Sequence, residues 1–150
     1  MTFTNIANNI DEAVNSLQRL DVDDQLAVLW FIYTDMKDGL NPSPTAGLEI
    51  SQAIVDQIQQ MSREEQLQAQ RDIIQGAGND ITREYQAMHS RVKLGVWYLL
   101  AQGMEEETIV PMPPNYELSS EAKELLNAVK GVDFEQKTNF MISAVSKMGS

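Results

Sequence analysis

The chain has 150 residues, a length typical of one domain, and we expect a single domain over residues 1–150. Its 22 acidic and 11 basic residues give a net charge of −11, and the basic residues are scattered, which disfavours nucleic acid as a partner. The absence of cysteine excludes disulfides, thiolate metal sites and thiol nucleophiles. The apolar segment 26–33 is far shorter than the roughly 20 residues that span a bilayer. We therefore expect a soluble, cytoplasmic protein without stable membrane insertion.

Apolar residues recur at helical spacing through most of the chain, and no alternating strand pattern occurs. The first three helices are predicted over residues 5–18, 22–37 and 46–60. Asp21 is placed to begin the second helix, and Gly39 to end it.

Five more helices are predicted, over residues 63–75, 80–89, 91–103, 119–129 and 134–148, which makes about eight in an all-α fold. Each start has a suitable N-cap residue, and Ser62 with Glu65 has the spacing of a capping box. The other predicted caps are Asn79, Ser90, Ser119 and Asp133. The predicted stops are Gly76, Gly103 and Gly131.

Two proline-rich stretches, residues 41–47 and 109–115, are predicted to be loops between helical groups. The second contains Ile109, Val110 and Met112, apolar residues that a fully solvated loop does not need. It therefore either packs on the helices or lines a cavity.

Residues suited to catalysis or metal binding are scarce. The single histidine, His89, lies at the end of a predicted helix, where an interaction with the helix C-terminus is the expected role. The acidic run 105–107 lacks the alternating oxygen ligands of a cation loop. No arrangement of nucleophile and base occurs, so we expect neither an enzyme nor a metal site.

Two apolar segments, residues 26–33 and 94–100, hold both tryptophans and two of the four tyrosines. Trp30 and Tyr33 are three residues apart and share one helical face. Trp97 and Tyr98 are adjacent and point about 100° apart, so only one of them can line a given pocket. Such aromatic stripes either close a core or clamp a flat hydrophobic ligand.

The strings at residues 24–33, 92–98 and 111–118 resemble the helical N-terminal domain of the orange carotenoid protein, in the order of that family and over nearly the whole chain. The resemblance implies two packed helical bundles with a carotenoid tunnel between them. The implied cofactor is a ketocarotenoid of the canthaxanthin, echinenone or 3'-hydroxyechinenone type. The family's ring-contacting aromatics correspond to Trp30, Tyr33 and Trp97. Its other tunnel residues correspond to Leu26, Leu29, Leu94, Met104, Met112, Tyr116 and Val145.

Departures from the family pattern predict which kind of member this is. Because the sequence ends at Ser150, we expect the second, mixed α/β regulatory domain of the family to be absent. An arginine of the family is replaced by Ile142, and an asparagine by Arg91. We expect a stand-alone, constitutively open carotenoid protein for photoprotection that quenches singlet oxygen or excited pigments.

Three alternatives stay open at the level of the sequence. One is an excitation quencher that docks on the phycobilisome light-harvesting antenna, which Ile142 disfavours; the others are a carotenoid carrier and a pigment-free helical adaptor. Besides the carotenoid, the partners to consider are the phycobilisome and a homologue of the C-terminal domain of the orange carotenoid protein. The expected state is a monomer or weak dimer, close to thylakoid membranes.

Overall fold

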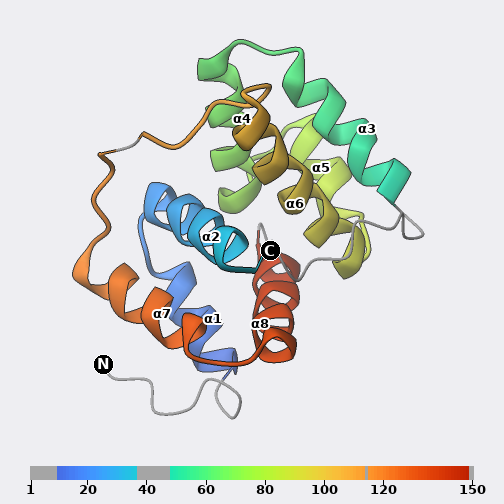
Figure 1. Ribbon diagram of the computed structural model, residues 1–150. Coiled ribbons are helices and arrows are strands. Elements are labelled where there is room, and N and C mark those ends of the chain that lie inside the picture. Colours follow the sequence, from blue (N-terminus) through green and yellow to red (C-terminus); the bar gives the residue numbers. More distant parts are fainter. Residues whose placement is uncertain (1–9, 37–47, 114, 149–150) are drawn as a thin grey trace.

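The computed structural model describes residues 10–36, 48–113 and 115–148, which form eight α-helices and no strand (Figure 1). This confirms the predicted all-α class. The helices are α1 (Ile10–Gln18), α2 (Val22–Met36), α3 (Leu48–Gln59), α4 (Arg63–Gln75), α5 (Asp80–Gln86), α6 (Ser90–Glu106), α7 (Ser120–Lys130) and α8 (Phe134–Lys147). No helix of the described residues is both long enough and apolar enough to cross a bilayer.

The helices pack as two bundles, in agreement with the expected architecture. Helices α1, α2, α7 and α8, from the two ends of the chain, form one bundle, and α3 to α6 form the other (Figure 1). In the first, α1 packs against α8 and α2 against α7; in the second, α3 packs against α6 and α4 against α5. The bundles meet where α6 contacts α8 and where α2 contacts α4 and α6. Helix α2 therefore lies at the interface between the two bundles.

One continuous hydrophobic core runs through both bundles. It forms because helical spacing places the apolar residues of each helix on the face that meets its neighbours. Ile32, Ile58, Leu100 and Phe140 are among its fully buried side chains. Burying each aliphatic side chain of this kind stabilises the fold by about 1.5–3 kcal/mol.

Most of the predicted N-caps are confirmed. Ser62 Oγ accepts a hydrogen bond from Glu65 N at 3.2 Å, and Glu65 Oε1 accepts one from Ser62 N at 3.1 Å, which completes the capping box. The side chains of Asn79, Ser119 and Asp133 likewise accept hydrogen bonds from the first turns of their helices. These caps satisfy backbone N–H groups that have no partner inside the helix.

The predicted helix end at Gly103 is wrong. Helix α6 continues to Glu106, and Glu107 takes the left-handed conformation (φ 65°) that ends it. Gly103 instead allows Ile109 to pack closely against the backbone of α6, because a Cβ atom at position 103 would lie only 2.5 Å from Ile109 Cγ1. The carbonyl of Gly103 accepts hydrogen bonds from Thr108 N at 2.9 Å and Ile109 N at 3.1 Å.

The predicted roles of His89 and Ser90 are also wrong. Helix α5 ends at Gln86, and the exposed His89 is the N-cap residue of α6, without a side-chain capping bond. Ser90 is instead the first residue of α6, and its Oγ accepts a hydrogen bond from Ser146 Oγ of α8 at 2.6 Å. The Ser90 hydroxyl, which was predicted to cap a helix, thus forms a contact between the two bundles. The predicted helical residues 5–9, the stop at Gly39 and the loop 41–47 lie outside the described residues.

Candidate functional site

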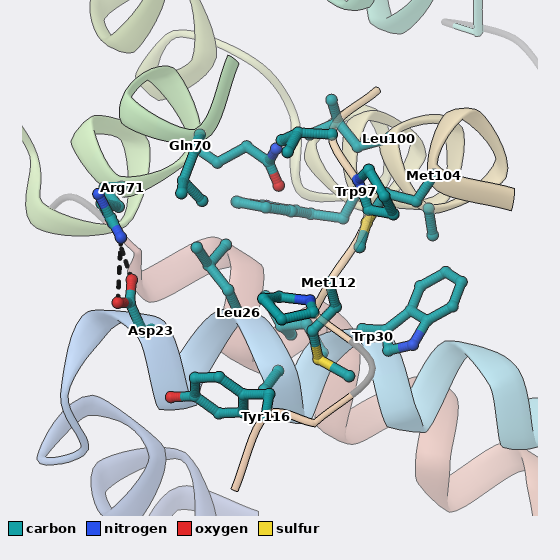
Figure 2. Close-up of a pocket in the computed structure, with 17 residues that line it drawn as sticks. Asp23, Leu26, Trp30, Gln70, Arg71, Trp97, Leu100, Met104, Met112 and Tyr116 are labelled. Carbon is teal, nitrogen blue, oxygen red and sulfur yellow. Dashed lines mark hydrogen bonds and ion pairs between the residues drawn. The ribbon is translucent and has the colours of Figure 1, made fainter. Parts of the chain in front are cut away.

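A pocket of about 250 Å³ lies between the two bundles (Figure 2). This volume is just below the roughly 300–1,000 Å³ of typical ligand pockets. Its walls come from α2, α4, α6 and the segment 107–119, which connects α6 to α7. The lining residues are Asp23, Leu26, Ala27, Leu29 and Trp30 on α2; Leu67, Gln70 and Arg71 on α4; Trp97, Leu100, Ala101 and Met104 on α6; and Val110, Pro111, Met112, Pro113 and Tyr116 on the connecting segment.

The α2 wall contains Trp30, which stacks on Tyr33 with ring centroids 5.9 Å apart and an interplanar angle of 24°. Tyr33 is buried behind this wall and does not line the pocket. Burial raises the pKa of its phenol, and the carboxylates of Glu105 and Glu106 raise it further. Tyr33 therefore acts as a neutral ring that supports Trp30.

On α6, Trp97 lines the pocket and Tyr98 does not, in agreement with their expected angular separation. Trp97 Nε1 donates a hydrogen bond to the hydroxyl of Tyr85 at 2.9 Å, and that hydroxyl donates to the carbonyl of Val145 at 3.0 Å. Tyr85 is fully buried, and burial raises the pKa of its phenol. The polar edge of the indole is thus satisfied by the core, which leaves apolar surface of Trp97 for the pocket.

The connecting segment covers the pocket and is held at two points. Val110 N donates to Gln66 Oε1 at 2.7 Å, and the hydroxyl of Tyr116 donates to Asp24 Oδ1 at 2.7 Å. Gln66 and Asp24 are both buried. Burial raises the pKa of the Tyr116 phenol, as does its hydrogen bond to Asp24.

Both expectations for this segment are met, by different residues. Ile109 packs into the core with no exposed surface. Val110 and Met112 line the pocket.

A polar edge of the pocket was missing from the sequence-based prediction. Arg71 of α4 and Asp23 of α2 form a bidentate ion pair, with Nε to Oδ1 at 2.8 Å and Nη2 to Oδ2 at 3.0 Å. Gln70, the neighbour of Arg71, is a buried amide of the lining. Polar side chains of helices are usually solvated, so the spacing of apolar residues along the sequence does not predict that Asp23, Gln70 and Arg71 line one pocket.

Of the ten predicted site residues, the seven that line the pocket are Leu26, Leu29, Trp30, Trp97, Met104, Met112 and Tyr116. Tyr33, Leu94 and Val145 lie outside the lining. Leu94 and Val145 belong to the hydrophobic core. Some of the residues that the prediction omitted, such as Ala27, Leu100 and Ala101, are helical neighbours of predicted ones, and the others lie mostly on α4 and on the connecting segment.

The sequence matches the family described as "Orange carotenoid protein, N-terminal" over residues 3–150. The chain belongs to this family. An orange carotenoid-binding domain-containing protein of Nostoc sp. is 36% identical over 142 residues, which cover 93% of this chain and 83% of the relative. Solved structures of carotenoid proteins from Anabaena (Nostoc) sp. are also similar.

The red carotenoid protein binding canthaxanthin is 45% identical to this chain, with a TM-score of 0.83, and the match covers 94% of this chain and 98% of that one. The orange carotenoid protein binding canthaxanthin is 30% identical, with a TM-score of 0.87 and 95% of this chain covered. This chain covers 47% of the orange carotenoid protein, about half its length. This chain thus matches one solved structure over nearly the whole of that structure and another over about half of it.

Proposed function

We propose that this chain binds a ketocarotenoid in the pocket between its bundles and uses the pigment to quench singlet oxygen. The observation that carries the proposal is the placement of Trp30 from one bundle and Trp97 from the other in the lining of one largely apolar pocket. A polyene offers no hydrogen bonds along its length and is bound by apolar contact. Two similar structures are those of proteins binding canthaxanthin, which supports a diketo pigment here.

The pigment is longer than the pocket, so we expect the lining to adapt when it enters. Met104 and Met112 are half-buried, unbranched and flexible, and they line the pocket. Movement of these side chains would lengthen the pocket without a rearrangement of the bundles. Tyr33, which stacks on Trp30, and Leu94, which lies on the same helix as Trp97, are outside the present lining and would contact the pigment only after such a change.

In this proposal no residue makes or breaks a bond. Singlet oxygen transfers its energy to a low-lying state of the polyene, which returns to the ground state by releasing heat. The protein keeps the pigment in solution, holds its rings and leaves the polyene accessible to oxygen. A surface with a net charge of −11 favours the solubility of such a complex.

The test is to purify the chain from cells that synthesise ketocarotenoids and to record its visible absorption spectrum. A broadened, red-shifted carotenoid band that elutes with the protein is the expected result. The singlet-oxygen phosphorescence lifetime should then be shorter with the pigmented protein than with the same protein stripped of pigment. Trp30→Ala and Trp97→Ala should lose or shift the band, whereas Lys123→Ala, an exposed change on α7, should not.

Other outcomes point to the alternative functions. A colourless, well-folded protein would contradict the proposal and favour a helical adaptor. Rapid transfer of the pigment to an acceptor would indicate a carrier, and quenching of phycobilisome fluorescence would indicate antenna docking. Ile142, where the family has an arginine, is half-buried and packs against the core. It supplies no positive charge for docking, so oxygen quenching is the better-supported role.

A further inference from the structure

We infer that one end of the pocket is a polar subsite, formed by Arg71, Gln70 and Asp23, that receives the keto oxygen of a carotenoid's terminal ring. This inference rests on the proposed function and goes beyond it. It assigns a preference for pigments with an oxygenated ring to named side chains of this chain.

The ion pair lies at the edge of the pocket. Figure 2 shows Arg71 and Asp23 at one side of the cavity, and Trp30 and Met104 at the other. The Arg71 side chain is 31% exposed and the Asp23 side chain 42% exposed, so the pair is partly reached by water. Arg71 comes from one bundle and Asp23 from the other, and their two hydrogen bonds hold the guanidinium in a defined orientation.

Gln70 extends this polar edge into the buried part of the pocket. It is 5% exposed, and its Nε2 donates to the carbonyl of Gln66 at 3.4 Å, the long limit of a hydrogen bond. Figure 2 shows its side chain reaching from α4 towards Trp97 on α6. A buried amide on an apolar wall is costly without good hydrogen bonds. A ligand group that hydrogen-bonds to this amide would reduce this cost.

The hydrogen-bonding groups at the polar edge suit a ligand atom that accepts hydrogen bonds. A guanidinium has five N–H donors and no acceptor, and Asp23 engages two of the five. Gln70 adds an amide, with one N–H of Nε2 engaged by the Gln66 carbonyl and with an acceptor oxygen. The indole N–H of Trp97 and the hydroxyl of Tyr116 are already committed to Tyr85 and Asp24. The donors that the polar edge offers to a ligand are therefore chiefly the remaining N–H groups of the Arg71 guanidinium.

A keto oxygen only accepts hydrogen bonds, so it complements these donors. A ring hydroxyl could accept from the same donors, and it could donate to the Asp23 carboxylate or to the Gln70 amide oxygen. A hydrocarbon ring would displace water from the guanidinium and return no hydrogen bond. Sites built to form a hydrogen bond discriminate against ligands that lack it. Pigments with an oxygenated ring, canthaxanthin among them, are therefore expected to be retained over pigments with only hydrocarbon rings.

The experiment is a competition for the pigment-free chain. The protein is mixed with equal amounts of canthaxanthin, zeaxanthin and β-carotene in detergent micelles and separated by size exclusion, and the retained pigments are quantified. Canthaxanthin should be retained about tenfold over β-carotene, the ratio expected when one charge-assisted hydrogen bond is formed at a partly exposed site.

Variants test which residues carry the preference. Arg71→Met should bring the canthaxanthin to β-carotene ratio close to one, and Gln70→Met should lower the ratio by less, while both variants still bind pigment. Arg83→Met and Gln68→Met are matched controls, because Arg83 pairs with Asp80 and Gln68 with Asp72 on exposed surface outside the pocket. Both controls should keep the wild-type ratio, and circular dichroism checks the folding of all four variants.

Two results would overturn the inference. The wild-type chain could retain the pigments equally, or both Met variants could keep its preference. A chain that retains no pigment at all would contradict the proposed function itself, and the subsite with it. Pigment binding and pigment preference are measured separately, so the two failures are distinguishable.

Discussion

The hydroxyl of Tyr85 joins three helices, and its removal in Tyr85→Phe should destabilise the fold. It accepts from Trp97 Nε1 on α6 at 2.9 Å and donates to the carbonyl of Val145 at 3.0 Å. Val145 lies in the last turn of α8, where helix carbonyls have no partner within the helix. Tyr85 itself is on α5 and fully buried. The substitution thus leaves a buried donor and a buried acceptor unpaired.

The expected cost follows from these two groups. An unsatisfied buried polar group costs about 1–3 kcal/mol, so the two groups left by Tyr85→Phe should lower the free energy of unfolding by about 2–6 kcal/mol. In a chain of this length, the midpoint of thermal unfolding should fall by about 4–24 °C. The indole of Trp97 would also lose its orienting bond, so the pigmented variant should show a shifted absorption band.

The measurement is urea unfolding followed by circular dichroism, with Tyr98→Phe as the matched control. The Tyr98 hydroxyl is buried and has no hydrogen-bond partner among the described residues. Its removal should therefore change the free energy of unfolding by less than about 0.5 kcal/mol, or stabilise the fold slightly. Equal destabilisation by the two variants, or a loss below about 0.5 kcal/mol for Tyr85→Phe, would refute the reasoning.

Three further predictions concern pH and the segment that covers the pocket. Burial raises the pKa of the Tyr98 phenol from 10.0 to about 12. As pH rises, the unfolded chain therefore loses this proton before the folded chain does. The contribution of Tyr98 to the free energy of unfolding is complete below pH 10 and is lost as the pH rises to 12. Urea unfolding at pH 11 should show a loss from this group of about 1.4 kcal/mol, which Tyr98→Phe abolishes. Gly103→Ala should cost about 1–3 kcal/mol by thermal unfolding, because the new Cβ forces the buried Ile109 to shift. An unchanged midpoint would contradict that close approach. Gln66→Leu removes the acceptor of the Val110 N–H group. Amide hydrogen exchange in residues 108–113 should therefore accelerate, and pigment retention should fall. Unchanged exchange would contradict the anchoring role of Gln66.

Much of the secondary structure was predictable because its signals are local. The capping box of Ser62 and Glu65 and the caps at Asn79 and Asp133 depend on residues three positions apart. The local signals failed where a distant contact competed with them. Ser90 forms a hydrogen bond with Ser146 instead of capping a helix. Gly103 leaves space for Ile109 instead of ending one.

The candidate site was predictable in its apolar part. The helical stripe of Leu26, Leu29 and Trp30 follows from spacing, and the resemblance to a carotenoid-binding domain added Trp97 and Met112, all of which line the pocket. The polar edge was not predictable, because Asp23 and Arg71 are 48 residues apart in sequence. No local pattern distinguishes an ion pair across a bundle interface from two solvated charges.

The sequence by itself determined the all-α class, most helix boundaries and the residues that carry the aromatic wall, because helical periodicity and capping act over one or two turns. Only the tertiary structure decided that α1 and α2 join α7 and α8 rather than their neighbour α3. It also decided that Tyr85 receives the indole N–H of Trp97 and that Arg71 meets Asp23 at the pocket edge. These contacts depend on how whole helices pack against one another, and packing is set by the summed fit of side chains far apart along the chain.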